Sequence, residues 1–207
     1  MVLTLGLITL VAAFALGYVY DWTKEPIAQA QIDKQNKAIR SVAGEFENDP
    51  LKESFEVHRR REGKHRFQRR RRMGKMKETK AKDEVVLNFY PTRQDDKPNV
   101  TAIKSYSDKG YSGRIELMVG IDTEGKIKNI EVLNHKETPG LGSKIKDQSF
   151  ISQFIGQSLD SFDFRPKKDG GQVDAISGAT ISSRAFAEAV KLSLEAYNDT
   201  KHETDSL

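Results

Sequence analysis

The sequence contains no cysteine, and that absence narrows the chemistry available to the protein. A chain without thiols forms no disulfide and gives no thiolate to zinc, to an iron–sulfur cluster or to a thioether-linked haem. Histidine is scarce as well, and its four positions lack metal-ligand spacing: His58, His65, His135 and His202. We therefore expect no metal centre, and any redox chemistry has to come from a cofactor that needs no cysteine.

Charge is missing from the first 20 residues. A helix rises about 1.5 Å per residue, so this stretch would span about 30 Å, which matches the hydrocarbon core of a bilayer. Tyr18, Tyr20 and Trp22 would then lie in an interfacial aromatic belt. A cleaved signal peptide is the alternative, but a basic start is missing and no clear small-x-small cleavage site precedes the mature part. The sequence predicts a single transmembrane helix, with an anchor over residues 1–22.

The next stretch, residues 23–57, is rich in charge, and its apolar positions are imperfectly spaced. We expect a helical stalk here, with helix from Asp21 to about Asn48. Pro26 has no backbone N–H to donate, so the helix is predicted to kink or restart close to the membrane.

One segment accounts for the basic character of the chain. Residues 59–82 hold 13 Lys and Arg residues against two Glu residues, a net charge of +11, whereas the whole chain carries +4 and the remainder therefore −7. The segment has no sustained apolar period, so we expect a disordered insert over 58–83. Besides a solvated loop, it is compatible with contact to anionic lipid, docking on an acidic partner subunit, or nucleic-acid binding. Nucleic acid is not expected, because no aromatic stacking platform accompanies the charges.

The pattern from Glu84 to Asn198 predicts an α+β domain, an antiparallel sheet with helices packed against it. The expected strands are 84–90, 101–106, 114–122 and 127–133, with a polar loop over 91–99 and a hairpin turn at 122–126. The expected helices are 149–155 and 183–198, and the second has the apolar stripe Phe186, Ala189, Val190, Leu194 and Tyr197. We expect residues 199–207 to form a polar tail.

The segment Asp174-Ala175-Ile176-Ser177-Gly178-Ala179-Thr180 stands directly before the last expected helix. A hydroxyl on a small-residue turn at a helix N-terminus suits a phosphate, because free N–H groups and the positive end of the helix dipole point there. Gly178 and Ala179 let the backbone come close. From these residues alone the alternative is an ordinary helix start, with Ser182 or Ser183 as the N-cap.

A second segment, Glu137-Thr138-Pro139-Gly140-Leu141-Gly142, follows an expected strand. It makes a tight, low turn over which a planar ring could lie; taken alone, a plain Pro-Gly turn is the alternative. Together the two segments resemble the FMN-binding domain shared by the G subunit of Rnf electron-transport complexes and the C subunit of sodium-pumping NADH:quinone reductases. The resemblance covers roughly residues 84–198 and the N-terminal span, and the run at 23–27 favours the G subunit.

The resemblance implies a covalent cofactor. In the family the pattern Asp-x-x-Ser/Thr-Gly-Ala-Thr carries FMN, joined through its phosphate to the last threonine, here Thr180. A separate flavin transferase makes that bond, and Asp174 belongs to the pattern it recognises; a turn-forming Asx residue is the alternative for Asp174. The resemblance gives the remaining cofactor-binding residues as Ser177, Gly178 and Ala179 around the phosphate, and Glu137, Thr138, Leu141 and Gly142 beside the ring.

The function that the resemblance implies is that of an electron-transfer subunit of a membrane-bound, ion-translocating oxidoreductase complex. Its partners would be the other subunits, membrane lipid and, during maturation, the transferase. The flavin would carry out the electron chemistry, so no catalytic side chain is expected. Without a Gly-x-Gly-x-x-Gly fingerprint the chain should not oxidise NADH alone. Two alternatives stay open: the C subunit of a sodium-pumping reductase, and a membrane-anchored binding module that acts through its basic loop.

The charges and the family disagree on orientation. Lys24, Lys34, Lys37 and Arg40 follow the span and would favour a cytoplasmic C-terminal side. Family members place the flavin domain outside the cytoplasm and usually carry a short basic segment before the helix, which this sequence lacks. We follow the family and expect a single-pass inner-membrane protein with its FMN domain on the extracytoplasmic side.

The uncharged span gives the first testable prediction. The full chain should fractionate with membranes and resist carbonate extraction, whereas a fragment that starts near Gln29 should be soluble. A C-terminal alkaline phosphatase fusion should be active. An inactive phosphatase fusion beside an active cytoplasmic reporter would contradict the expected orientation.

Overall fold

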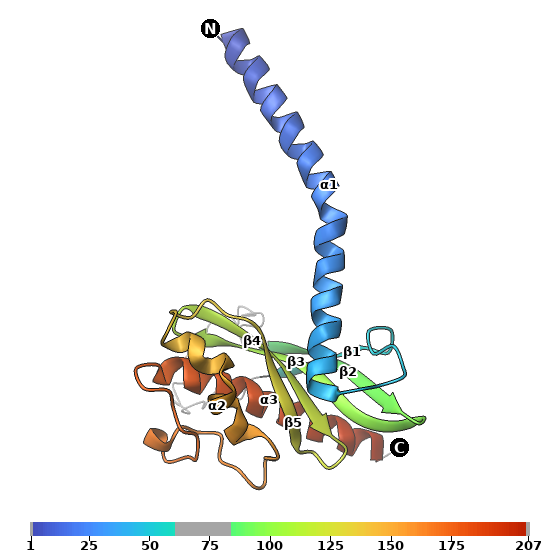
Figure 1. Ribbon diagram of the computed structural model, residues 1–207, viewed down its shortest axis with the longest axis vertical. Coiled ribbons are helices and arrows are strands. Elements are labelled where there is room, and N and C mark those ends of the chain that lie inside the picture. Colours follow the sequence, from blue (N-terminus) through green and yellow to red (C-terminus); the bar gives the residue numbers. More distant parts are fainter. Residues whose placement is uncertain (1, 61–83, 206–207) are drawn as a thin grey trace, which may run out of the picture. The chain divides into compact units, whose positions relative to one another are not determined.

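The computed structural model describes residues 2–60 and 84–205. The chain divides into two compact units, Met1–Ala38 and Ile39–Leu207. The first unit lies within the long helix α1 (Val2–Ala43), drawn in blue in Figure 1. By length and composition α1 can cross a membrane, since its most apolar 18-residue window has a mean hydropathy of 1.5.

Two features of α1 differ from expectation. Pro26 lies inside a continuous helix, so of the two predicted outcomes, a kink or a restart, the restart does not occur. The helix also ends at Ala43 rather than near Asn48. Gly44 takes φ +84° and its N–H donates to the carbonyl of Arg40, which is the usual left-handed stop of a helix.

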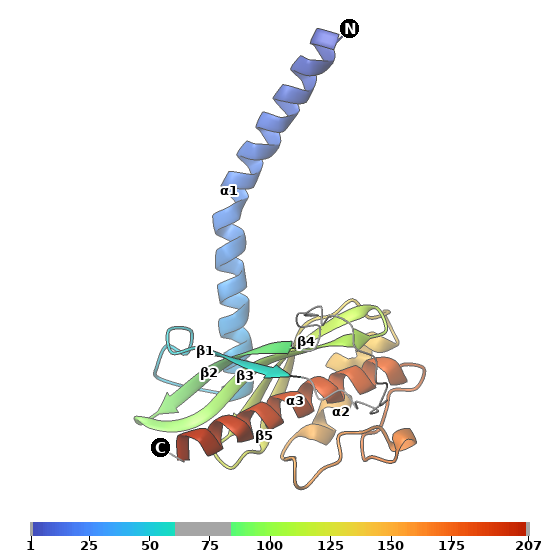
Figure 2. The same cartoon turned by 180° about the vertical axis from the view of Figure 1, so that it is seen from behind.

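The second unit is built on a five-stranded antiparallel sheet in the order β1-β2-β3-β4-β5. Its strands are β1 (Phe55–Arg60), β2 (Glu84–Gln94), β3 (Lys97–Gly110), β4 (Gly113–Asp122) and β5 (Ile127–Asn134). The helix α3 (Thr180–Asp205) crosses one face of the sheet, as Figure 2 shows, and the short helix α2 (Gln148–Ile151) continues into a 3₁₀ turn, Ser152–Phe154. The predicted α+β class is confirmed.

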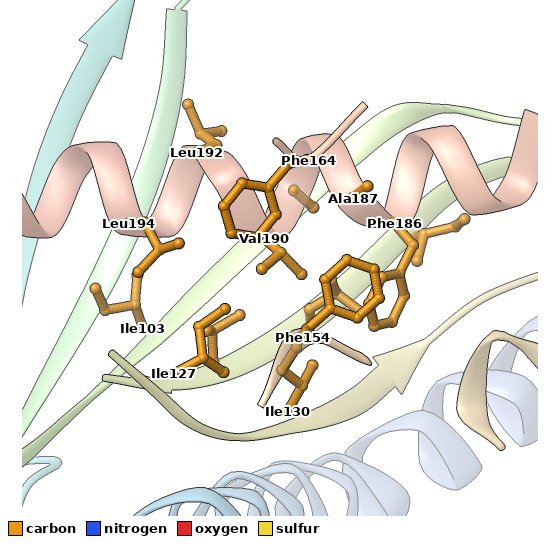
Figure 3. Packing of buried hydrophobic residues seen from close by; sticks show 14 of the residues in the cluster. Ile103, Ile127, Ile130, Phe154, Phe164, Phe186, Ala187, Val190, Leu192 and Leu194 are labelled. Atoms are coloured by element: carbon orange, nitrogen blue, oxygen red, sulfur yellow. The ribbon is translucent and has the colours of Figure 1, made fainter. Parts of the chain in front are cut away.

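The core lies between α3 and the sheet. The helix stripe predicted from the sequence is confirmed: Phe186, Val190 and Leu194 are fully buried. They meet Ile103 and Ile127 of the sheet and Phe154 of the 3₁₀ turn (Figure 3). Each fully buried side chain of this size contributes about 1.5–3 kcal/mol relative to an exposed one.

The opposite face of the sheet receives the last turn of α1. Val42 is buried there, directly over Gly120 of β4. A Cβ atom at Gly120 would lie 2.5 Å from the carbonyl oxygen of Val42, so only glycine permits this approach. The end of α1 is thereby part of the folded domain.

The prediction of a loop over residues 91–99 is wrong. β2 and β3 run through it and join at a two-residue turn, Asp95 and Asp96, with φ of 51° and 57°. Both residues tolerate the left-handed region, which a tight hairpin requires. The polar residues of this stretch lie on an exposed part of the strands. Pro91 lies where the register of the β2–β3 pairing shifts, and a residue without an N–H is tolerated at such a position.

β1 was not predicted, and it changes the limits of the stalk and the insert. Residues 55–57 belong to this strand rather than to the stalk, and 58–60 belong to it rather than to a disordered insert. Arg59 forms ion pairs with Glu195 (3.3 Å) and Asp199 (2.6 Å) of α3. The remainder of the predicted insert, residues 61–83, lies outside the described residues.

Strand pairing places three connections at one end of the sheet. Arg60 pairs with Glu84, so the β1–β2 connection leaves from adjacent positions. Because the strands are antiparallel, the β3–β4 turn and the end of β5 lie at that same end. The candidate site described below is formed there.

This pairing predicts the effect of shortening the β1–β2 connection. Replacing residues 61–83 with Asn-Gly should leave the melting temperature nearly unchanged, because Arg60 and Glu84 already stand opposite each other and a two-residue turn suits them. Thermal unfolding followed by circular dichroism measures the effect.

The matched control begins the same replacement at Arg59. It removes two of the six β1–β2 residue pairs and the ion pairs of Arg59, so it should lower the melting temperature more. Equal losses in the two deletions would show that residues 61–83 contribute to the fold.

Candidate functional site

The site begins at the N-terminus of α3. This helix starts at Thr180, so Ser182 and Ser183 lie inside its first turn, and their predicted alternative as N-caps is wrong. The Ser183 hydroxyl donates to the carbonyl of Ala179 and accepts from the N–H of Ile176, both at 3.0 Å. The start of the helix is therefore fixed by a serine within its first turn.

The three hydroxyl groups of this turn differ in their bonding. The Ser182 hydroxyl donates to Glu137 Oε2 at 2.6 Å, and Ser183 is bonded as above. The half-buried Thr180 hydroxyl makes no hydrogen bond to any residue that the structure describes. Thr180 thus presents the unengaged hydroxyl of the turn.

A pocket of about 530 Å³ opens beside Thr180, and both predicted segments line it. This volume is typical of small-molecule sites. The lining residues predicted from the sequence are Glu137, Thr138, Leu141, Gly142, Gly178, Ala179 and Thr180. The lining residues that sequence reasoning missed are Tyr111, Lys168, Ile181 and Ser182. Ile181 and Ser182 follow Thr180 directly in the sequence, whereas Tyr111 and Lys168 are marked by no motif and reach the pocket through the fold.

The loop over 137–142 is a compact turn. The carbonyl of Thr138 accepts the N–H groups of Leu141 and Ser143, both at 3.2 Å, and Gly140 takes φ +76°. The turn leaves the Leu141 side chain 47% exposed, and a Cβ atom at Gly178 would lie 3.4 Å from it. The two segments therefore meet closely at Leu141.

Three exposed apolar side chains, those of Tyr111, Leu141 and Ile181, line the pocket and form its apolar rim. Their side chains are 70%, 47% and 47% exposed, although large apolar side chains in this domain are mostly buried. Among the described residues of the second unit, Phe55 is the other large apolar side chain that is comparably exposed. Apolar side chains gathered at a pocket mouth suit a planar ring.

Lys168 lines the pocket from a loop that is stabilised by two ion pairs, one to α3 and one within the loop. Arg184 of α3 makes a two-pronged ion pair with Asp169, at 2.8 and 3.1 Å. Within the loop, Arg165 hydrogen-bonds to Asp163 and lowers the pKa of that carboxyl to about 2. The loop therefore carries the cationic Lys168 on a support held against α3.

Asp174 and Ser177 do not line the pocket. The exposed Asp174 carboxylate pairs with Lys167 at 2.6 Å. The side-chain amide of Gln153 holds its backbone on both sides, accepting from the Asp174 N–H (2.7 Å) and donating to the Asp174 carbonyl (3.3 Å). Ser177 is exposed. Within the described ranges 2–60 and 84–205, no group of three or more His, Asp or Glu side chains is arranged to hold a metal ion.

Comparison with known proteins identifies the family. Residues 110–195 match the FMN-binding domain family, which takes in the β3–β4 turn and both pocket segments. A relative from Stutzerimonas stutzeri, named as the G subunit of an ion-translocating oxidoreductase complex, is 33% identical over 200 residues, covering 93% of this chain and 78% of the relative. The chain belongs to the family of G subunits of ion-translocating oxidoreductase complexes. The resemblance inferred from the two segments is thus confirmed.

Other G-subunit relatives match over a shorter range. Those from Shewanella baltica and Vibrio cholerae are 42% and 39% identical, over 54% and 55% of this chain. The chain spans about half the length of these curated relatives, 55% and 56% respectively.

Two solved structures are similar in part. The C subunit of the Na(+)-translocating NADH-quinone reductase from Parabacteroides distasonis aligns at 25% identity and a TM-score of 0.45, over 54% of this chain and 61% of that one. NqrC from Shewanella oneidensis aligns at 26% identity and a TM-score of 0.43, over 54% and 56%. The family assignment does not depend on this likeness.

The close packing around Gly142 in this G-subunit family member gives a testable prediction. A Cβ atom there would lie 2.6 Å from Glu137 Oε2 and 2.7 Å from the Ser182 hydroxyl. Gly142→Ala should therefore lower the free energy of unfolding by about 1–3 kcal/mol, as overpacking does. The loss should be smaller in a Glu137→Ala background, because one of the clashing atoms is then absent.

Gly156→Ala is the matched control, measured by the same denaturant titrations. Gly156 has φ +76° and open space where a Cβ would stand, so its cost comes from the backbone alone and should be equal in both backgrounds. A Gly142→Ala cost that Glu137→Ala leaves unchanged would contradict the packing described here.

Proposed function

We propose that this chain is the FMN-carrying electron-transfer subunit of an ion-translocating oxidoreductase complex, with FMN joined through a phosphoester to Thr180. The observation that carries the proposal is the single unengaged hydroxyl of the first turn of α3, which opens onto the pocket between the two sequence segments. The domain match and the G-subunit relatives support FMN as the cofactor.

The surroundings of Thr180 suit a phosphate. The first N–H groups of the 26-residue helix α3 and the positive end of its dipole lie at Thr180. The cationic Lys168 lines the same pocket. Gly178 takes φ +76°, which bends the chain just before the helix without a side chain in the way. These groups would hold the phosphate, and the apolar rim of Tyr111, Leu141 and Ile181 would hold the ring.

The attachment replaces the phosphoanhydride bond between the two halves of FAD with a phosphoester to Thr180, and AMP leaves. The Thr180 oxygen forms a bond to the phosphorus of the FMN half of FAD, the bond to AMP breaks, and the hydroxyl proton is lost, so nothing is oxidised or reduced. An ordinary threonine is a poor nucleophile, and the described residues that line the pocket include no histidine, so a separate transferase has to activate it. The exposed Asp174 carboxylate stands where such an enzyme can reach it.

Once bound, FMN supplies the electron chemistry, and the chain supplies its position. A covalent tether keeps the cofactor in a compartment that has no flavin pool to replace it. The helix α1 would anchor the domain to the inner membrane on its extracytoplasmic side, next to the other subunits of the complex. Residues 61–83 would add contacts to an acidic subunit or to anionic lipid, as their charge suggests.

The anchor chemistry gives a direct prediction. Full-length protein coexpressed with a flavin transferase should give a fluorescent band on a denaturing gel, and the peptide that contains Thr180 should gain the mass of FMN less water. Thr180→Ala should abolish the label, because the acceptor oxygen is removed.

Ser182→Ala and Ser183→Ala are the matched controls, since each removes a hydroxyl from the same helical turn. Both should still carry the label, because these hydroxyls are hydrogen-bonded within the protein. Label retained in Thr180→Ala would show that another residue is the anchor. Absence of flavin from the wild-type chain would favour a binding module that acts through its basic loop.

A further inference from the structure

Glu137 is a buried carboxylate at which three segments of the pocket meet; only 5% of its surface is exposed. Its Oε1 accepts the N–H of Ser112, in the β3–β4 turn, at 3.1 Å. Its Oε2 accepts the hydroxyl of Ser182, in the first turn of α3, at 2.6 Å. Glu137 itself begins the loop over 137–142. One side chain therefore joins the turn next to Tyr111, the helix start next to Thr180, and the loop that carries Leu141.

Two glycines leave room for this carboxylate. A Cβ atom at Gly110 would lie 2.6 Å from Glu137 Oε1, and one at Gly142 would lie 2.6 Å from Oε2. Each oxygen is thus enclosed by a glycine backbone on one side and a hydrogen-bond donor on the other. The side chain has little freedom to move, and neither do the segments attached to it.

Stability alone is a poor explanation for a carboxylate at this position. Both of its donors are neutral groups, and burying a charged group costs free energy that two such bonds offset only in part. An apolar side chain would fill the same space at a smaller cost. The position of Glu137 in the pocket wall indicates that the carboxylate acts on the site itself.

We propose that Glu137 is a positioning residue that sets the shape of the pocket before FMN is attached. This inference rests on the proposed function. Glu137 holds the β3–β4 turn and the first turn of α3 at a fixed separation, so that Tyr111 on one side and Thr180 on the other accept the two ends of the same cofactor. Its negative charge also lies in the wall of that pocket, where it opposes the uptake of electrons and lowers the midpoint potential of the flavin.

Replacement of Glu137 by glutamine separates the two effects. The amide oxygen of Glu137→Gln can accept the Ser112 N–H, and its NH₂ group can donate to the Ser182 oxygen, so both connections are kept while the charge is lost. Glu137→Ala loses the connections and the charge together. Ser182→Ala loses one connection and keeps the charge.

The test uses full-length protein and a flavin transferase with FAD. The initial rate of attachment is read from in-gel fluorescence, and the midpoint potential of the loaded protein is measured by spectroelectrochemistry. Glu137→Ala should slow attachment by about tenfold or more, as expected for the loss of two buried hydrogen bonds. Ser182→Ala and Glu137→Gln should slow it less, and Ser182→Ala should still reach full labelling. Glu137→Gln should raise the midpoint potential, whereas Ser182→Ala should shift it less.

Glu188→Ala is the matched control. Glu188 likewise accepts a serine hydroxyl, that of Ser107 at 3.1 Å, and it also binds Lys109 at 2.7 Å, so it joins α3 to β3 without lining the pocket. Its replacement should leave both the rate and the potential as in the wild type. Equal slowing by Glu188→Ala and Glu137→Ala would overturn the inference, because any loss of a link between α3 and the sheet would then suffice.

The other possible results also test the positioning role of Glu137. Wild-type rates in both Glu137→Ala and Ser182→Ala would refute the positioning role. Where Glu137→Ala fails to fold, a wild-type rate in Ser182→Ala together with an unchanged potential in Glu137→Gln would refute it. Each variant is also prepared with Thr180→Ala. Label that persists there would refute the proposed anchor whatever Glu137 does, whereas label that depends on Thr180 but not on Glu137 would refute this inference alone.

Discussion

The packing of α3 against one face of the sheet is the interaction on which the rest of the structure depends. The buried stripe of Phe186, Val190 and Leu194 closes the core over β3 and β4. The same packing fixes where the helix begins, and its first turn carries Thr180. Core and site therefore share one element, in which buried apolar side chains stabilise the helix and the N-terminal turn stays open to the pocket.

The pocket itself is formed where several connections meet at one end of the sheet. The β3–β4 turn, the loop after β5 and the start of α3 come from distant parts of the chain. Antiparallel pairing brings them to the same end, and the buried carboxylate of Glu137 joins them through Ser112 and Ser182. Connections of this kind suit a binding site, because a rigid sheet supports them while their side chains remain free to face a ligand.

Local patterns explain which elements were predictable. In β4 and α3 the core covers one face of the element. Apolar residues therefore recur with the period of a strand or of a helix, and the sequence predicted both elements correctly. β1 was missed because its last residues read as the start of a basic run; in the structure Arg59 lies over the acidic end of α3. The 91–99 stretch was misread because polar residues on an exposed part of a strand look like a loop. In both cases pairing across strands overrode composition.

The sequence by itself determined the class of the fold, the apolar N-terminal helix, the two segments beside the pocket and the family to which they point. Each of these depends on the types of residues that lie close together in the sequence. The tertiary structure alone decided that Tyr111 and Lys168 line the same pocket, that Asp174 does not line it, and that the Glu137 carboxylate is buried. It also decided that Thr180, rather than Ser182 or Ser183, presents a hydroxyl without a hydrogen bond to any described residue, because such bonds depend on how the segments fold together.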